Sequence, residues 1–286
     1  MVSVIEGWCQ VEYILKEKAD GKKITVKNVQ EVLLEMIKDI DDICKKNNIE
    51  YVLTSGTTLG AIRHEGFIPW DDDLDIAMMR DQYEKFIKVL EKHLPNKYVF
   101  HCFEKDNRYD VTWPAMKIRK KGTYVKESNT LLFNKCPDSD GLFIDIFIFD
   151  YMSNKTIVDL PFRLFNTLLM PLIIFFENIR INPVILKRLF RGNAILYGKL
   201  NRKSKYIGDD LTWTYRSPLR PYKYKYEDVF PVKHVKFEDT LLPVQNNGHS
   251  YLSNHFGPNY MTPPPKNKRM PKHIVDISLT SDKAEE

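Results

Sequence analysis

Four aspartates stand within five positions in the stretch from Trp70 to Ile76. If this stretch enters a strand, the alternation of side chains places Asp73 and Asp75 on one face while their apolar neighbours face the core. Two carboxylates this close repel each other unless a cation lies between them, and such oxygen ligands suit Mg²⁺ or Mn²⁺. An acidic turn at a strand entrance would account for Asp71 and Asp72, but it accounts poorly for Asp75.

A further acid, Asp145, lies inside the apolar run from Leu142 to Ile148. Burying an unpaired carboxylate costs several kcal/mol, so this side chain requires a partner. A Lys or Arg inside the fold would be such a partner. The more specific alternative is a metal ion shared with Asp73 and Asp75. In such a site Asp145 either completes the ligand set or accepts the proton of an attacking hydroxyl.

Small residues fill the stretch from Ser55 to Gly60, just upstream of the acids. Gly56 and Gly60 would let the backbone approach a phosphate, while Thr57, Thr58 and the amides near a helix N-terminus can donate hydrogen bonds to it. The spacing matches neither a P-loop nor a dinucleotide fingerprint. Because Mg²⁺ typically combines one or two carboxylates with substrate phosphates, the glycine turn and the acids together predict a metal-dependent site for a nucleotide pyrophosphate.

Two pairs of basic residues lie near these motifs. Arg63 and His64 stand between the glycine turn and the acids and can contact a donor phosphate or substrate, although a helix-end cation and a loop-fixing imidazole are equally good interpretations. Lys117 and Arg119 alternate on a predicted strand, so both point to one face and can neutralise phosphate. Solvated charges on an edge strand are the favoured alternative for this second pair.

The elements that must position these residues alternate between helix and strand. The spacing of apolar residues predicts a helix from Thr25 to Asn47, with Thr25 as N-cap, and Asp81 caps a second predicted helix. The run Leu142–Phe149 is the most apolar and β-rich, and we expect it at the centre of a sheet. Other strands are predicted at Tyr51–Leu53, Leu74–Met78, Tyr98–Phe103, Ala115–Arg119 and within Phe230–Pro243.

Residues 151–205 differ from the rest of the chain in both pattern and charge. Apolar helical spacing dominates, and Pro161, Pro171 and Pro183 are predicted to break the segment into short helices. Ten Lys and Arg against two acids give this stretch +8, although the whole chain carries only +5. An apolar helix beside such cations is typical of an element that lies on an anionic membrane surface, and a buried subdomain with a solvated basic face is the alternative.

Composition narrows the class of protein further. The chain has 286 residues, and its mild basic excess gives no support for nucleic-acid binding. Its four cysteines form no C-x-x-C pair, which favours reduced thiols in a cytoplasmic protein, and the acidic N-terminal segment does not read as a signal peptide. The longest uncharged apolar segment, Leu164–Phe176, is shorter than the ~20 residues of a spanning helix, so no transmembrane anchor is predicted.

The long run from Ser55 to Ile76 resembles the hallmark of the LicD family, relatives of fukutin with a nucleotidyltransferase-type fold. Two further blocks look like the same family: Gly141–Asp150, and a C-terminal block from Phe230 to Pro265 followed by Lys268 and Arg269. The resemblance implies an α+β or α/β fold, a nucleotidyltransferase-like mixed sheet flanked by helices with a helical insertion. It implies a catalytic core in 1–150, a basic helical insertion in 151–226 and a segment in 227–286 that completes the catalytic domain.

The same resemblance implies metal-dependent transfer of phosphocholine, or a related phospho-alcohol, from CDP-choline or a similar CDP-activated donor. The acceptor would be a sugar hydroxyl of a bacterial cell-surface glycan precursor, of the teichoic acid, lipopolysaccharide or capsule kind, lipid-linked in some cases. Lys268 and Arg269 become candidate substrate-binding residues on this ground alone. A choline head group favours an aromatic enclosure, for which Trp70, Trp113 and Tyr124 are available.

Two alternatives remain open from the sequence. One is a true nucleotidyltransferase acting on a small hydroxylated substrate, and the other is a catalytically inactive scaffold in glycan assembly. The retained acids argue against the scaffold, because an inactive site has no reason to keep carboxylates that destabilise the fold. We expect an enzyme of the cytoplasm that contacts the inner face of the cytoplasmic membrane through residues 155–205.

Overall fold

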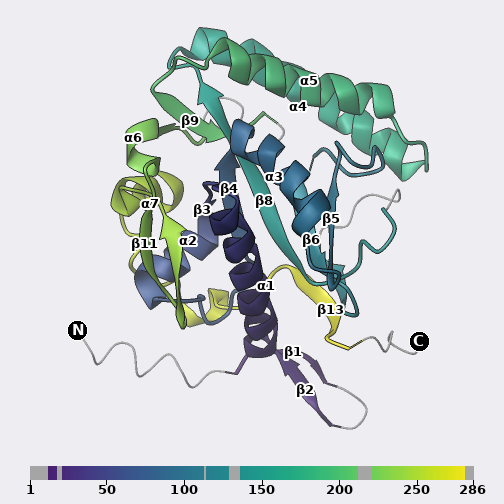
Figure 1. Cartoon of the computed structure of the whole chain (residues 1–286), viewed down its shortest axis with the longest axis vertical. Coiled ribbons are helices and arrows are strands. Elements are labelled where there is room, and N and C mark those ends of the chain that lie inside the picture. Colours follow the sequence, from purple (N-terminus) through teal and green to yellow (C-terminus); the bar gives the residue numbers. More distant parts are fainter. Residues whose placement is uncertain (1–11, 18–20, 113, 129–135, 212–220, 281–286) are drawn as a thin grey trace.

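A computed structural model describes residues 12–17, 21–112, 114–128, 136–211 and 221–280, so Trp113 lies outside the described residues. The centre of the molecule is a mixed sheet organised around its longest strand, β8, which confirms the predicted α+β fold class (Figure 1). The strands of this sheet are β3 (Val52–Leu53), β4 (Asp75–Met79), β5 (Tyr98–Cys102), β6 (Met116–Lys120), β8 (Phe143–Met152), β9 (Tyr206–Asp209) and β10 (Tyr224–Lys225).

Strand β8 is central because three other strands pair with it. β4 runs parallel along one of its edges, and β3 continues the sheet antiparallel to β4. The other edge is shared by β6, near the beginning of β8, and by β9, near its end. The prediction of a central, strongly apolar strand at Leu142–Phe149 is therefore confirmed, and the segment after 151 returns to the sheet through β9 and β10.

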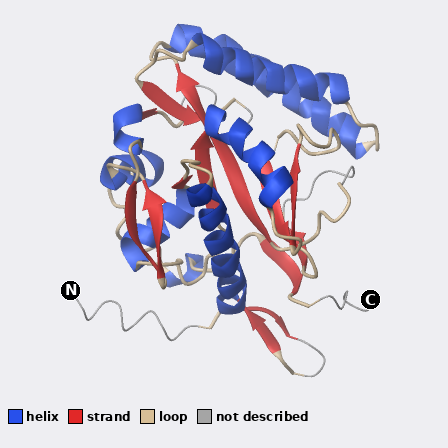
Figure 2. Cartoon of the chain, viewed as in Figure 1, coloured by secondary structure: helices blue, strands red, loops and turns tan. Residues whose placement is uncertain are grey.

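Helices cover both faces of the sheet (Figure 2). On one face lie α1 (Val26–Lys46) and α3 (Arg80–His93), which contact β4 and β8. On the other face α2 (Ser55–His64) contacts β4 and packs against α7 (Gly248–Phe256). Apolar residues of β4 alternate between the two cores, so this strand is buried on both sides.

The predicted caps hold in one case and fail in the other. Thr25 caps α1 as predicted, since its hydroxyl accepts a hydrogen bond from the Asn28 amide. Asp81 does not cap α3, because Met79 is the N-cap residue and Asp81 lies inside the first turn. Its negative charge at that position still interacts favourably with the helix dipole.

Three two-stranded antiparallel sheets surround the central sheet. They are β1 (Ile14–Glu17) with β2 (Lys23–Thr25), β11 (Lys233–Phe237) with β12 (Thr240–Val244), and β7 (Tyr124–Glu127) with β13 (Ile274–Ser278). The last pair brings the C-terminal strand beside the middle of the chain. Two short helices, α6 (Tyr226–Val229) and η2 (Lys266–Lys268), lie in the C-terminal part of the chain.

Residues 156–200 form two long helices, α4 (Thr156–Asn178) and α5 (Val184–Leu200), which lie together at one end of the molecule (Figure 1). The predicted breaks at Pro161 and Pro171 are wrong, because α4 continues through both. Each proline removes only one backbone donor, and both are exposed, so their rings project away from the packed side of the helix. Only Pro183 stands at a break. By length and composition α4 can cross a membrane, which the broken-helix prediction did not anticipate.

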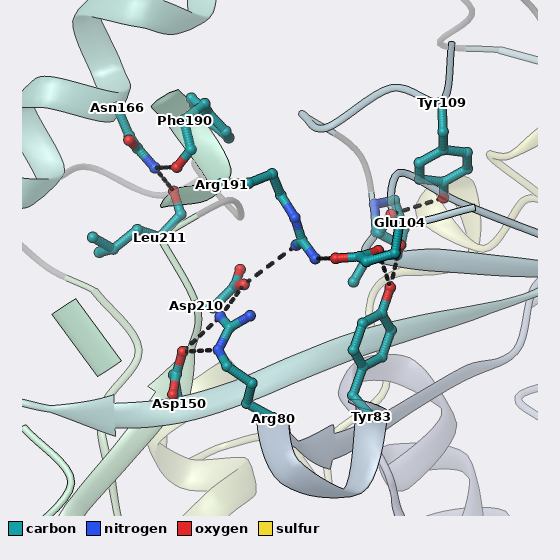
Figure 3. A network of polar contacts seen from close by, with 12 residues as sticks. Arg80, Tyr83, Glu104, Tyr109, Asp150, Asn166, Phe190, Arg191, Asp210 and Leu211 are labelled. Atoms are coloured by element: carbon teal, nitrogen blue, oxygen red, sulfur yellow. Dashed lines mark hydrogen bonds and ion pairs between the residues drawn. The ribbon is translucent and has the colours of Figure 1, made fainter. Parts of the chain in front are cut away.

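A buried polar network fastens α3 and α5 to the end of β8 (Figure 3). Arg80 Nε lies 2.6 Å from Asp150 Oδ2, and its Nη2 lies 2.8 Å from Asp210 Oδ2. Arg191 of α5 approaches the same Asp210 carboxylate at 3.7 Å and also pairs with Glu104. Burial raises the pKa of Asp150 to about 6 although Arg80 opposes the shift, so this carboxylate depends on its partner to stay ionised.

Replacing Arg80 with Met should lower the free energy of unfolding by about 3–5 kcal/mol, because the buried Asp150 loses its compensating charge and the buried Asp210 loses the shorter of its two ion pairs with arginine. Urea unfolding followed by circular dichroism measures this difference. The matched control is Lys88→Met, which removes an exposed cation from the same helix and should change the value by no more than about 0.5 kcal/mol. Equal effects of the two substitutions would contradict the role given to the network.

Candidate active site

Strand register brings the predicted acids together. Asp75 stands opposite Asp145 in the parallel pair β4–β8, and Lys117 stands opposite Asp145 in the antiparallel pair β6–β8. Paired residues on neighbouring strands share a face of the sheet. The three side chains therefore form a row across adjacent strands, on the face covered by α2 and α7.

Lys117 compensates the charge of Asp145. Its Nζ lies 2.9 Å from Asp145 Oδ1 and 2.9 Å from Glu127 Oε2, and Arg119 Nη2 lies 2.9 Å from Glu127 Oε1. Lys117 and Arg119 are both buried, so the interpretation of these cations as solvated edge charges is wrong. The buried carboxylate of Asp145 thus has the basic partner that the sequence left open, and its burial alone does not require a metal ion.

The turn that carries the acids is fixed by α1 and α2. Gln30 of α1 donates from Nε2 to the carbonyls of Ile68 and Asp71, both at 2.9 Å. The Asp75 amide donates to Thr57 Oγ1 at 2.9 Å, so Thr57 positions the start of β4. Gln30 was not predicted as a functional residue, although it occupies a position on the apolar stripe of α1, where a polar side chain signals a specific partner.

Asp72 binds the backbone of the C-terminal segment. Its carboxylate accepts hydrogen bonds from the amides of residues 272–274, the shortest being 2.8 Å from Ile274 N. His273 Nε2 then lies 3.2 Å from Asp73 Oδ2. Neither contact was predicted, because about two hundred positions separate the partners and no local pattern marks them.

The acids raise one another's pKa. Burial, followed by the charges of Asp73, Asp145 and Asp71, raises the pKa of Asp75 well above its ordinary value. Burial raises the pKa of Asp71 well above its ordinary value too, with Asp73 and Asp72 adding to the shift. For Asp145, burial raises the pKa to about 6 against the opposing effect of Lys117. Such mutual shifts show that like charges crowd this site and that an added cation would relieve them.

The small-residue stretch is a helix and not a glycine turn, which corrects the predicted phosphate cradle. Ser55–Gly60 forms the first turns of α2. A Cβ on Gly56 would lie 2.9 Å from Asp71 Oδ2, and one on Gly60 would lie 2.5 Å from the Gly66 carbonyl oxygen. Both glycines therefore make room for the loop that leads to the acids.

Thr58, also predicted to bind substrate, is fully buried. Its hydroxyl donates to the Leu53 carbonyl at 2.6 Å. The residue is thus part of the packing between α2 and β3, and its side chain cannot reach a ligand. The amides at the N-terminus of α2 remain next to the acidic turn, as the contact between Gly56 and Asp71 shows.

Arg63 and His64 lie at the end of α2 and contact each other. Arg63 Nε donates to His64 Nε2 at 3.0 Å, and Arg63 Nη1 donates to the Tyr260 carbonyl at 2.8 Å. Burial and the Arg63 charge lower the pKa of His64 to about 4, so this imidazole is neutral at pH 7. Burial also lowers the pKa of Arg63, while the nearby Asp71 opposes and Arg269 adds to that shift.

The C-terminal segment supplies the other predicted cations. The Arg269 guanidinium lies 5.5 Å from the centre of the Trp70 ring, and its Nε donates to the Pro264 carbonyl. Trp70 therefore already has a cation over its face, and the edge of the His64 ring packs against it as well. Lys268 is exposed in η2, and Tyr124 is half-buried on β7. The structure thus brings Arg269 to the side of the site formed by Arg63.

Among the residues that the structure describes, no three His, Cys, Asp or Glu side chains are arranged as a preformed metal site. The donor set nevertheless fits a hard cation in the usual manner of Mg²⁺, which combines one or two carboxylates with substrate phosphates. Asp73 and Asp75 offer two such carboxylates at the start of β4, and the Asp73 side chain keeps 14% of its surface exposed. Lys117 pairs with Oδ1 of Asp145, so a metal ion at this residue would be bound through Oδ2.

Comparison with known proteins agrees with this architecture. Residues 48–166 match the family described as the LicD/FKTN/FKRP nucleotidyltransferase domain. They carry α2, β4, β6 and β8, the four aspartates of the 71–75 turn and Asp145. The chain therefore contains a LicD family domain, as its motifs predicted. It is similar to the lipopolysaccharide cholinephosphotransferase LicD of Haemophilus influenzae, with 27% identity over 282 residues, which covers 90% of this chain and 99% of that protein.

Two uncharacterised rickettsial proteins share a shorter segment. RP689 of Rickettsia prowazekii is 44% identical over 70 residues, and RT0683 of Rickettsia typhi is 39% identical over 79 residues. Each match covers about a quarter of both chains.

Glu127 should make stability depend on pH. Burial would raise its pKa, but Lys117 and Arg119 outweigh burial and lower it to about 2. A carboxyl whose folded pKa is depressed stabilises the protein above its unfolded pKa, near 4.5, and loses that contribution as pH falls toward 2. We expect Glu127→Gln to lower the free energy of unfolding at pH 7 by on the order of 2 kcal/mol, with the difference from wild type shrinking below pH ~4.5.

Urea unfolding at a series of pH values measures this difference. The control is Glu31→Gln, which neutralises an exposed acid on α1 and should give a small difference that does not change with pH. A difference for Glu127→Gln that stays constant from neutral to acid pH would contradict the ion network assigned to β6 and β7.

Proposed function

We propose that this protein transfers phosphocholine, or a related phospho-alcohol, from a CDP-activated donor such as CDP-choline to a sugar hydroxyl of a bacterial cell-surface glycan. The observation that carries the proposal is the meeting of the aspartates of the 71–75 turn with Asp145 inside the LicD family domain. Similarity along most of the chain to a lipopolysaccharide cholinephosphotransferase supports the phosphocholine group and the glycan acceptor. Precursors of lipopolysaccharide, teichoic acid and capsule all present such hydroxyls.

Asp73 and Asp75 are the proposed ligands of Mg²⁺ or Mn²⁺, with phosphate oxygens of the donor completing the set. When bound, such an ion lowers the charge of the pyrophosphate and stabilises CMP as a leaving group. The crowding of carboxylates supports this assignment, because the half-buried Asp75 lies beside Asp73, Asp145 and Asp71, and Lys117 opposes their effect on its pKa. Thr57 and Gln30 hold the turn that sets the direction of the two carboxylates.

Arg63 and Arg269 are the proposed contacts of the donor phosphates. The two guanidinium groups are close enough that Arg269 lowers the pKa of Arg63, and Asp71 lies beside them. Two like charges held near each other favour an anion between them, and a planar guanidinium suits the oxygens of a phosphate. The exposed Lys268 lies next to Arg269, where it can add to the positive field around an incoming nucleotide.

In the proposed reaction the sugar hydroxyl attacks the phosphorus that bears choline. A new sugar oxygen–phosphorus bond forms, the bond from that phosphorus to the bridging oxygen breaks, and CMP leaves with the electron pair. Asp145 either accepts the proton of the hydroxyl or offers its Oδ2 to the metal ion, because Lys117 pairs with its Oδ1. His64, neutral and bonded to Arg63, then acts by positioning that guanidinium.

We place the reaction in the cytoplasm, on the side where CDP-activated donors are made. The described cysteines Cys44, Cys102 and Cys136 are free and buried, which agrees with a reducing compartment. The acceptor and the donor are the expected partners.

A second candidate function is transfer of the nucleotide itself. The family description names a nucleotidyltransferase domain, and the same acids and cations would serve attack at the phosphorus next to the nucleoside. The two functions differ in their products, because phosphocholine transfer releases CMP and nucleotidyl transfer from CTP releases pyrophosphate.

Replacing Asp75 with Asn should reduce transfer from CDP-choline by roughly a hundredfold to a thousandfold. The same change removes one of several repelling charges, so the free energy of unfolding should stay equal or rise. Transfer rates and urea unfolding curves measure the two effects, and EDTA should abolish wild-type transfer until Mg²⁺ is added back. The control Asp42→Asn alters an exposed acid on α1 and should leave both quantities unchanged. Near-normal transfer by a folded Asp75→Asn protein would refute the metal assignment.

The product assay separates the candidate functions. Purified protein incubated with CDP-choline, Mg²⁺ and a glycan acceptor should release CMP in proportion to phosphocholine incorporated. With CTP in place of CDP-choline it should release no pyrophosphate above background. Pyrophosphate release without CMP would establish the nucleotidyltransferase, and release of neither product would support an inactive scaffold.

A further inference from the structure

Helix α4 exposes an apolar stripe to solvent along its whole length. From Leu164 onward the side chains recur three or four residues apart, and Ile157 lies seven residues, or about two turns, before Leu164, so all share one face. Ile157 and Leu168 keep 82% and 71% of their surface exposed. Phe175 near the other end is 57% exposed. The stripe consists of Ile157, Leu164, Leu168, Leu172, Phe175 and Ile179. An apolar face this long is unusual on a monomeric soluble protein.

The opposite side of α4 is buried and polar. Asp159 pairs with Arg163 at 3.0 Å, and Glu177 forms an ion pair with Lys187 of α5 in which both side chains are essentially fully buried. Asn166 donates to the carbonyls of Phe190 and Leu211 (Figure 3). Because these bonds fix the polar side against the protein, the helix cannot turn its apolar stripe inward without leaving buried charges unpaired.

Helix α5, like α4, buries ionic side chains and exposes apolar ones. Lys187 and Arg191 point inward, where Arg191 pairs with Glu104, while Ile185 and Leu200 are 73% and 66% exposed. Leu189 and Leu196 lie between these two on the exposed side. The α4–α5 hairpin therefore exposes a large apolar surface while it buries ionic side chains beside apolar residues such as Phe190 and Tyr197, which is unusual for a helix pair that covers a soluble core.

The exposed charges around the hairpin all have one sign. Every charged side chain between residues 155 and 205 that is exposed is Lys or Arg, because the two acids of this segment, Asp159 and Glu177, are buried. The cations gather where α5 ends and include Lys199, Arg202 and Lys203. A lipid surface with anionic head groups matches both the apolar stripe and this charge.

We propose that the α4–α5 hairpin seats the protein on an anionic bilayer, with the apolar stripe in the boundary between head groups and acyl chains. The polar bonds of the inner side hold α4 against the rest of the protein, so the helix lies along the surface and does not span the membrane. A second copy of the chain is a poorer occupant, because a two-fold interface would bring the same cations face to face.

The hairpin and the acidic site stand at opposite ends of β8. Asp145 is the third residue of this strand and Met152 is the last, a separation of about 23 Å at the usual rise of a strand. While the hairpin lies on the bilayer, a hydroxyl that reaches the site must therefore be at a comparable distance from the bilayer surface. This favours a sugar some way along a lipid-linked glycan over a sugar next to the lipid.

Vesicle flotation at moderate salt tests the docking surface. The wild-type protein should float with vesicles of phosphatidylcholine and phosphatidylglycerol and bind much less to vesicles of phosphatidylcholine alone. Leu168→Glu places a charge in the middle of the stripe and should reduce the bound fraction at least roughly tenfold. The control Leu241→Glu changes a leucine of β12 that is similarly exposed, and it should leave binding unchanged. Urea unfolding of both variants checks that each is folded.

Three results of the lipid experiments would overturn the proposal. They are failure of the wild-type protein to bind the anionic vesicles, equal loss of binding in the two variants, and retention of bound protein after alkaline carbonate extraction, which would indicate a spanning helix. Light scattering without lipid completes the test. A dimer that Leu168→Glu dissociates would assign the stripe to a second copy, whereas a monomer supports the lipid surface.

Discussion

The structure depends on holding like charges together at the start of two parallel strands. Asp75 and Asp145 are paired by the register of β4 and β8, and the turn before β4 adds Asp71 and Asp73. Repulsion and burial both oppose this arrangement, as the raised pKa values of these groups record. The fold tolerates it because bonds to neighbouring elements fix the backbone around the acids, and because Lys117 and His273 supply partial compensation.

Hydrogen bonds from distant parts of the chain hold the backbone of the candidate site in place. Gln30 binds the turn from α1, Thr57 binds the first residue of β4 from α2, and Asp72 binds the backbone of residues 272–274. Arg269, a few residues before this contact, lies near Arg63 on the same side of the site. A site that combines carboxylates with nearby guanidinium groups suits a ligand that brings phosphate and a divalent ion together.

Local patterns were sufficient to predict the helix at 25–47, the strand that carries Asp75 and the central position of β8. They also drew attention to Asp75, because an acidic turn at a strand entrance accounts for Asp71 and Asp72 but accounts poorly for Asp75. They failed where the answer depends on long-range pairing. No local signal could show that Lys117 stands opposite Asp145, and so the carboxylate was left without a definite partner. Pro161 and Pro171 were wrongly predicted to end helices. Both lie on the exposed side of α4, where their rings do not disturb the packed side.

Binding of Mn²⁺, followed by electron paramagnetic resonance, tests the central claim most directly, since free and bound ions give different signals. Bound Mn²⁺ should appear, or tighten strongly, when CDP-choline is added to the wild-type protein. A folded protein in which Asp73 and Asp75 are both replaced by Asn should bind CDP-choline without gaining the bound ion. The same Mn²⁺ affinity in that protein as in wild type would show that these carboxylates do not hold the metal.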